Sequence, residues 1–209
     1  MSQLIACAWE HGLVLAADRR VVLEREHGRQ VHSVRKLYPL GGRAALATSG
    51  AAVGIGLSRA VSRALRRRLV PALGDLEAYV LSVFQREYDA FVQQGAQWFA
   101  RHPEAHRRSY VLLGGRTEDG GFRFSFYASE EHGQPYRRLR TLSALTAPRR
   151  LGLEARLARA AAQGANADDV ARMVVEGLRQ VAAKDPAVAG PFDVAVFSDS
   201  GARFQTFGP

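Results

Sequence analysis

The sequence predicts an α/β protein in which two antiparallel β-sheets lie between two layers of helices, a four-layer α/β/β/α sandwich. The main observation is that the chain contains two runs of strands, each followed by a pair of helices. Short turn signals containing glycine separate neighbouring strands, which favours antiparallel hairpins. Since no internal repeat, low-complexity tract or linker interrupts the pattern, residues 1–209 are predicted to form a single domain.

The N-terminal half carries the first run of strands and its helices. Strands are predicted at 3–10, 13–17, 34–40 and 44–48, with turns at His11-Gly12 and Gly41-Gly42. The charged segment 21–33 is predicted to be an excursion without a strand. Helices are predicted at about 51–70, ending at Pro71, and at about 75–99, where apolar residues recur broadly at helical spacing.

The C-terminal half repeats this order after a polar loop at 102–108. Its strands are predicted at 109–114, 122–128 and near 136–142, and the closing strands at 192–198 and 202–207. Between them, helices are predicted at about 149–163 and 167–184. The alternation of strand runs and helix pairs is therefore the same in both halves.

The bulk composition favours a cytoplasmic protein. No apolar run is long enough to cross a bilayer, and the first residues lack the pattern of a secretion signal, so no membrane partner is expected. Cys7 is the only cysteine, which excludes an internal disulfide. Of the six histidines, only His102 and His106 approach the spacing of metal ligands, in a loop containing proline. Neither a metal nor another cofactor is expected.

The net charge of +9 and the pI of about 10.5 raise the alternative of a protein that binds RNA or DNA. The arginines are, however, scattered through the chain in short groups such as Arg66–Arg68 and Arg149-Arg150, each typical of a solvated helix face or loop. The enzymatic interpretation is therefore preferred, with no nucleic-acid partner.

Lysine is rare in this chain, because only two of the 29 basic residues are lysines. One of them, Lys36, begins the apolar segment Lys36–Leu40. Lysine offers a compact ammonium whose pKa can be lowered, whereas arginine stays charged. Together with the hydroxyl of Ser2 at the chain start and the acid Asp18 after the second strand, Lys36 indicates nucleophilic catalysis.

Four segments resemble the proteasome β-subunit family of N-terminal-nucleophile hydrolases, which includes bacterial proteasome-like peptidases. They are GLVLAADRR at 12–20, the Lys36-Leu37-Tyr38 strand, ALATSG at 45–50 and KDPAVAGPFDVAVFSDSG at 184–201, in the same order as in the family. The resemblance spans most of the chain and is weakest at about 85–165. It implies the N-terminal-nucleophile hydrolase fold, which is the four-layer sandwich already predicted, and a threonine-type endopeptidase acting on polypeptides.

The resemblance places the nucleophile of this family at Ser2, where threonine is usual. Removal of Met1 would free an α-amino group with an ordinary pKa of about 7.7–8.0, which suits a general base. By the same resemblance, Lys36 lies beside the nucleophile, Asp18 pairs with Lys36 and Asp185 helps to orient the terminal amine. Gly50 supplies a backbone N–H to the developing oxyanion. The pocket for the side chain preceding the cut is lined by Val21, Val34, Thr48 and Ala52.

One departure from the family concerns the support of the terminal amine. The family usually has a serine in a glycine-serine segment before the third helix, and the corresponding stretch here is 142–148, without glycine. Ser143 and Thr146 are the two candidate replacements. The residue three after Asp185, often a second serine, is Val188.

Assembly and activity leave two alternatives. By resemblance, the chain forms homo-oligomeric stacked rings whose active sites face an inner chamber, with an ATP-dependent unfoldase as an optional partner. The alternative to an active peptidase is a structural ring subunit with little or no activity, which the missing glycine-serine segment favours.

Overall fold

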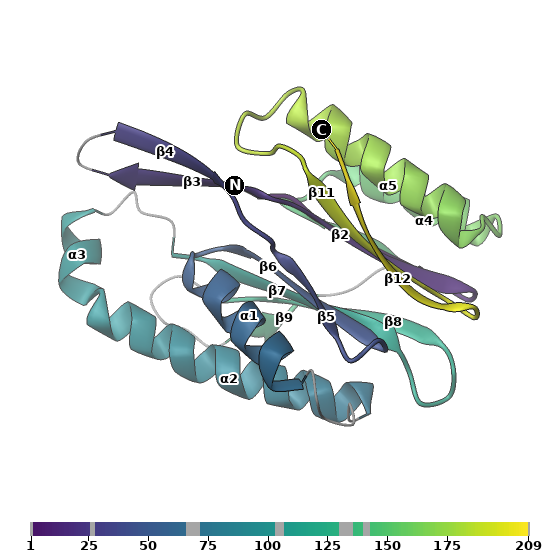
Figure 1. Ribbon diagram of the computed structural model, residues 1–209, viewed down its shortest axis with the longest axis horizontal. Helices are drawn as coiled ribbons and strands as arrows, with labels where there is room; N and C mark the ends of the chain where they lie inside the picture. The colour runs from purple at the N-terminus through teal and green to yellow at the C-terminus, as the bar shows by residue number, and fades with distance from the viewer. Residues whose placement is uncertain are drawn as a thin grey trace.

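The computed structural model describes residues 2–25, 28–65, 72–102, 107–129, 136–139 and 143–208, without the side chains of 23–25 and 29. Over these residues the protein is mixed α/β, with five helices and twelve strands in three antiparallel sheets (Figure 1). The predicted α/β class with antiparallel sheets is therefore confirmed. The third sheet was not predicted.

The first five-stranded sheet has the order β10-β1-β2-β11-β12. The chain start lies inside it, because Leu4 pairs with Ala17 of β2 on one side and with Ala147 of β10 on the other. Its strands are β1 (Leu4–Trp9), β2 (Gly12–Asp18), β10 (Ala144–Ala147), β11 (Phe192–Ser198) and β12 (Gly201–Phe207).

The second five-stranded sheet follows the order β5-β6-β7-β8-β9. Each strand pairs with the next along the chain. The connections are short hairpins apart from the one between β6 and β7, which contains three helices. Its strands are β5 (Leu37–Leu40), β6 (Ala44–Gly50), β7 (Ser109–Arg116), β8 (Phe122–Ala128) and β9 (Arg137–Arg138).

The third sheet is a two-stranded ribbon of β3 (Arg20–Arg25) and β4 (Gly28–Ser33). The expectation of an excursion without a strand at 21–33 was wrong. The error has a physical cause: the described residues of the ribbon are partly or fully exposed, so the segment lacks the apolar alternation by which a half-buried strand is recognised.

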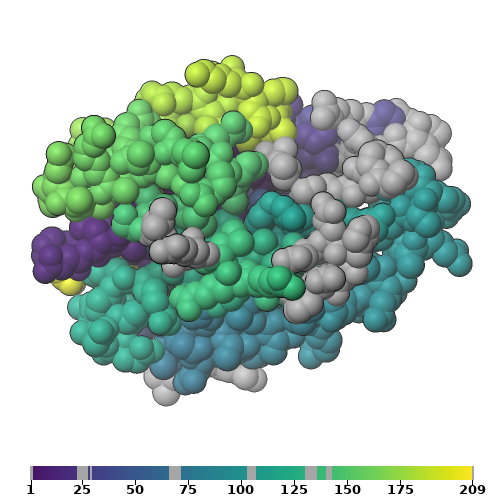
Figure 2. Space-filling model, turned by 180° about the vertical axis from the view of Figure 1, so that it is seen from behind, coloured from purple at the N-terminus to yellow at the C-terminus, as the bar shows by residue number. Residues whose placement is uncertain are grey.

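The helices form pairs on the outer faces of the two large sheets. α4 (Leu151–Ala162) and α5 (Ala167–Ala182) contact β1, β2, β10 and β11, whereas α1 (Val53–Leu65) and α2 (Leu73–Gln94) contact β5, β6 and β7. α3 (Ala96–Arg101) follows α2 after a break at Gly95. Seen from behind, the strand residues between 109 and 147 form a band between α4 and α2 (Figure 2). No helix in the described part of the chain is long and apolar enough to cross a membrane.

Side chains along a strand point alternately to the two faces of its sheet, and the buried residues form three clusters. In β1, Leu4 and Ala6 face the second sheet, while Ile5 and Cys7 face α4 and α5. A third cluster joins α1 and α2 to the second sheet, and includes Leu46, Val80, Phe84 and Val111. Because both faces of each large sheet are covered, β2 is buried at all seven positions.

Several predicted boundaries differ from the observed ones. The single helix expected at 75–99 is two helices, because Gly95 ends α2. The strand expected near 136–142 is reduced to β9, and 140–142 lie outside the described residues. Strand β10 was missed. The end of the first helix at Pro71 also lies outside the described residues.

The Cys7 thiol provides a test of this packing. It is fully buried, and burial raises the pKa of the thiol to about 12. Since only the thiolate reacts quickly, iodoacetamide should leave folded protein unmodified at pH 8 and alkylate it completely in denaturant. Mass spectrometry measures both. Rapid alkylation of folded protein would contradict the buried position of β1.

Candidate active site

Lys36, immediately before β5, has a buried side chain whose ammonium contacts the chain start and the end of β2. Its side chain is 1% exposed, and Nζ donates to three oxygen atoms: Ser2 Oγ at 2.5 Å, Asp18 Oδ2 at 3.0 Å and the carbonyl of Arg20 at 2.5 Å. An ammonium carries three N–H donors, so all three acceptors are satisfied at once. The three residues that the sequence associated with catalysis therefore meet at one atom.

Asp18, the last residue of β2, holds the nucleophile segment and the lysine together. Its carboxylate is fully buried: Oδ1 accepts from the Gln3 amide at 2.7 Å, and Oδ2 accepts from the Arg20 amide at 2.9 Å as well as from Lys36. The Asp18 amide donates in turn to the Gln3 carbonyl at 3.3 Å. One carboxylate thus fixes the start of β1 and the direction of the lysine.

Burial dominates the electrostatics of the pair. It lowers the pKa of the Lys36 ammonium, with the neighbouring Asp18 carboxylate opposing the shift. Burial also raises the pKa of Asp18, against the hydrogen bonds from Lys36 and from the two backbone amides. An ammonium with a lowered pKa is a stronger acid and hence a stronger hydrogen-bond donor to the Ser2 oxygen.

The hydrogen bonds around Lys36 bear on the identity of the base. In the ammonium form Nζ has no lone pair, so the lysine can stabilise charge on Ser2 Oγ but cannot take its proton. Ser2 is only half-buried, which leaves one side of its hydroxyl accessible. The arrangement suits a nucleophile that is polarised by Lys36 and deprotonated by another group.

Gly50 ends β6 beside this network. Two residues earlier, the Thr48 amide donates to the Lys36 carbonyl at 3.2 Å, which fixes β6 alongside the lysine. Gly50 has φ +88, and the next helix, α1, begins at Val53 with no acidic residue in its first turn. The positive end of the α1 dipole is therefore not neutralised by its own side chains.

The position of Gly50 predicts a strong effect of substitution. A Cβ there would lie 2.1 Å from the carbonyl oxygen of Arg108, in a backbone conformation that L-residues rarely adopt. Gly50→Ala should lower the free energy of unfolding by roughly 2 kcal/mol or more, measured by urea denaturation. Gly56→Ala is the matched control, because open space surrounds its Cβ position on α1, and it should be neutral or stabilising. Equal stability of the two variants would contradict the described turn.

The four residues expected to line a substrate pocket occupy different environments. Val21 and Val34 are half-buried, the first directly after Arg20 and the second two residues before Lys36. Ala52 is exposed in front of α1. Thr48 is fully buried and faces that helix, where its Oγ1 accepts from Ser58 at 3.2 Å.

Asp185 lies just beyond α5, where two hydrogen bonds hold its carboxylate. Oδ1 accepts from the Ala187 amide at 3.0 Å, and Oδ2 forms an ion pair with Arg150 at 3.1 Å. The same guanidinium donates from Nε to Gln3 Oε1 at 3.3 Å. The structure therefore links Asp185 to the Ser2 segment through Arg150 and Gln3.

Neither candidate hydroxyl is suitably placed to support the terminal amine. The Ser143 carbonyl pairs with the Ala8 amide, and Ala8 is six strand residues, or roughly 20 Å, from Ser2. Thr146 Oγ1 is buried, donates to Glu154 at 2.7 Å and accepts from the Arg150 amide at 2.6 Å. Val188 is buried in the core beneath α4 and α5.

Sequence reasoning missed Gln3 and Arg150. The pair Arg149-Arg150 was expected on a solvated face, but Arg149 binds Glu154 in a bidentate arrangement and Arg150 bridges Asp185 and Gln3. One signal was present: two cations precede the N-terminus of α4, where the helix dipole disfavours positive charge. Such a position indicates specific partners.

The described residues contain no group of three or more His, Cys, Asp or Glu side chains arranged to hold a metal ion. Neither protein-family models nor curated protein sequences give a match to this chain, so its function has to be inferred from the geometry of the site.

Proposed function

We propose that this protein is an endopeptidase of the proteasome β-subunit type, which uses Ser2 as its nucleophile after Met1 has been removed. The observation that carries the proposal is the 2.5 Å hydrogen bond from Lys36 Nζ to Ser2 Oγ within a buried network that also contains Asp18. A half-buried serine hydroxyl can satisfy its hydrogen bonds with water and does not require such a partner. Its contact with a buried lysine supports a chemical role.

The proposed reaction begins with attack of Ser2 Oγ on the carbonyl carbon of a peptide bond. The hydroxyl proton passes to the free α-amine of Ser2, directly or through water, while Lys36 stabilises the charge on Oγ. Backbone N–H groups near Gly50 and the positive end of α1 stabilise the oxyanion. The C–N bond then breaks as the leaving amine takes the proton, and water hydrolyses the ester on Ser2 by the reverse proton path.

The arrangement of layers supports the same proposal. One core lies between the two large sheets, and two further cores lie beneath the helix pairs. This order fits the four-layer α/β/β/α sandwich of N-terminal-nucleophile hydrolases, with the β3–β4 ribbon as an addition beside the site.

Intact-mass analysis with two covalent inhibitors tests the proposal. The purified protein should lack Met1, and a β-lactone should add once, with the modification mapped to Ser2. A peptide epoxyketone should also add, because it forms a ring with both the hydroxyl and the free amine. Labelling by the lactone in protein that retains Met1 would exclude the α-amine of Ser2 as the base, and the absence of both adducts would contradict the peptidase proposal.

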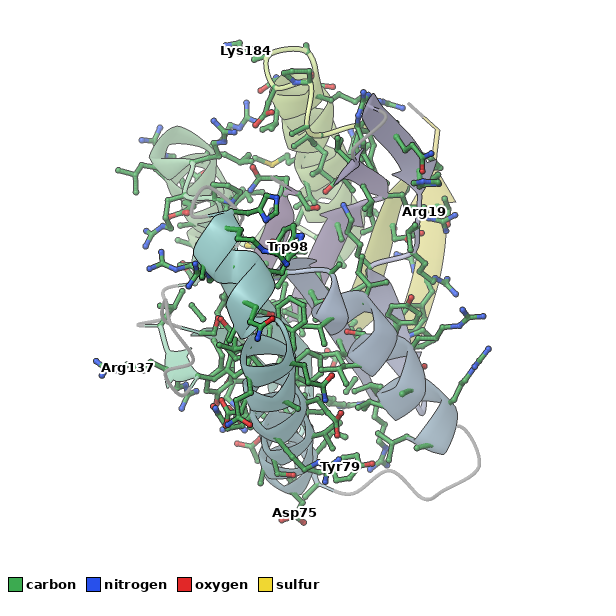
Figure 3. The ribbon with its side chains drawn as sticks, turned by 90° about the vertical axis from the view of Figure 1, so that its left-hand side faces the viewer. Arg19, Asp75, Tyr79, Trp98, Arg137 and Lys184 are labelled. Carbon is green, nitrogen blue, oxygen red and sulfur yellow. The ribbon has the colours of Figure 1, made fainter. Side chains whose placement is uncertain are left out.

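We further propose that the protein acts as a homo-oligomer of stacked rings, with the Ser2 sites in an enclosed chamber that protects folded proteins. Val31 on β4 and Trp98 on α3 are large apolar side chains about half exposed, at 52% and 48%. Both elements lie at the same end of the molecule, where Trp98 projects from α3 (Figures 1 and 3). Sedimentation velocity would test the assembly, and a monomer at micromolar concentration would contradict it.

A structural ring subunit without peptidase activity is the second candidate. It is favoured by the positions of Ser143 and Thr146, which leave the terminal amine without the hydroxyl partners expected from the resemblance. Assembled rings that lack Met1, cleave no fluorogenic peptide and resist both inhibitors would support this candidate.

A further inference from the structure

We infer that Arg150 is a positioning residue for the nucleophile: it holds the segment that carries Ser2 through its hydrogen bond to Gln3. The inference rests on the peptidase function proposed above and adds to it a residue that the resemblance does not assign. Its basis is a chain of buried and half-buried contacts running from Asp185 to Gln3.

Gln3, next to Ser2, is the first link. The residue is fully buried, which is unusual for a glutamine, and each polar atom of its side chain has a partner. Nε2 donates to the carbonyls of Leu4 and Pro148, at 3.1 and 3.0 Å, and Oε1 accepts from Arg150 Nε at 3.3 Å. Because the Gln3 amide is also held by Asp18, a shift of this side chain would be transmitted directly to Ser2.

Arg150 is the second link, and the geometry of its guanidinium matters. Nε points to Gln3 while Nη2 pairs with Asp185 Oδ2 at 3.1 Å, so one rigid plane joins the loop after α5 to the start of β1. A lysine ammonium is a point charge and does not reproduce a planar fork with two directed donors.

The position of Arg150 in the chain also indicates a dedicated role. It is the residue directly before α4, where the helix dipole disfavours a cation, and the nearest acid on that helix, Glu154, is occupied by Arg149 and Thr146. The unfavourable position is offset by the partners Asp185 and Gln3.

A cavity of about 400 Å³ lies against these groups and makes them accessible from outside. Arg150 and Asp185 line it together with Leu153, Gln180 and Lys184. Lys184 marks its place in Figure 3, in the loop where α5 ends. Truncation of Arg150 would extend this cavity toward Gln3. The space left beside the Asp185 carboxylate would fit a free guanidinium ion.

Chemical rescue tests the inference. Arg150→Ala should lower kcat for a fluorogenic peptide roughly tenfold or more with little change in KM, because substrate binding is not involved. Millimolar guanidinium chloride should restore much of the lost kcat. Arg150→Lys should remain impaired, since the ammonium cannot span Gln3 and Asp185.

Arg156→Ala is the matched control, because Arg156 on α4 also donates to a glutamine at 3.3 Å, but its partner is Gln180 and the contact is exposed. Its kcat should equal that of wild type and should not respond to guanidinium. A second measurement keeps Arg150 in place: Gln3→Leu removes its acceptor and should lower kcat to a similar degree.

The outcomes separate this inference from the peptidase proposal. Wild-type protein that cleaves no peptide and is not labelled at Ser2 would reject the function. Active wild type together with unimpaired Arg150→Ala or Gln3→Leu would overturn the positioning role alone. Full activity of Arg150→Lys would also overturn it, because charge without directed geometry would then suffice.

Discussion

Lys36→Met should abolish peptidase activity, with kcat reduced by a factor on the order of 10³ or more. The methionine fills a similar volume but offers no donor to Ser2 Oγ, which then lies beside an apolar group and loses the ammonium 2.5 Å away. Hydrolysis of a fluorogenic peptide measures the loss. Retention of more than a tenth of wild-type activity would contradict the role of Lys36.

The same substitution affects stability, and the two effects have to be separated. Loss of Lys36 leaves the Asp18 carboxylate buried without its cation, which should lower the free energy of unfolding by about 3–5 kcal/mol. Adding Asp18→Asn removes the unpaired charge while keeping most of the shape. The double variant should regain much of the stability in urea denaturation but none of the activity.

Ser2→Ala should have the larger effect on activity, with kcat falling by a factor on the order of 10⁴ or more, because the reacting oxygen itself is lost. Its effect on stability should be only about 1 kcal/mol, since among the described residues the half-buried hydroxyl makes one hydrogen bond, to Lys36. Peptide hydrolysis and thermal unfolding, measured on one preparation, distinguish the two quantities.

Ser2→Thr is the conservative counterpart. It keeps the hydroxyl and adds a methyl group that restricts χ1, so activity should stay within about tenfold of wild type. An active Ser2→Ala variant would show that another residue carries the reaction, whatever the behaviour of Ser2→Thr.

The sequence predicted most strands of the two large sheets, because apolar runs bounded by glycine turns are a local signal. β2 and β11 are examples, as both are almost completely buried and consist mostly of apolar residues. The ribbon β3–β4 escaped prediction, since its described side chains are half-buried or exposed and form no buried face. β10 was missed because its four residues, Ala144–Ala147, are too short a run to indicate a strand without their pairing with β1.

At the site, the meeting of Ser2, Asp18 and Lys36 was predictable. Lysine is rare in this chain, and the resemblance places the three residues together. The bridge made by Arg150 was not. In a chain with many arginines, the sequence around Arg150 does not indicate which residues it contacts. Gln3 and Asp185 approach it only through the pairing of β1 with β10 and the packing of α5.

The Asp18 carboxylate binds both the chain start and Lys36, which has a consequence for the newly synthesised protein. Three stretches within the first 36 residues, the chain start, the end of β2 and the approach to β5, converge on one acid. Under the proposed function, an incompletely folded chain lacks the contact between Ser2 and Lys36 and has no peptidase activity. Hydrolysis would then begin only after the chain has folded.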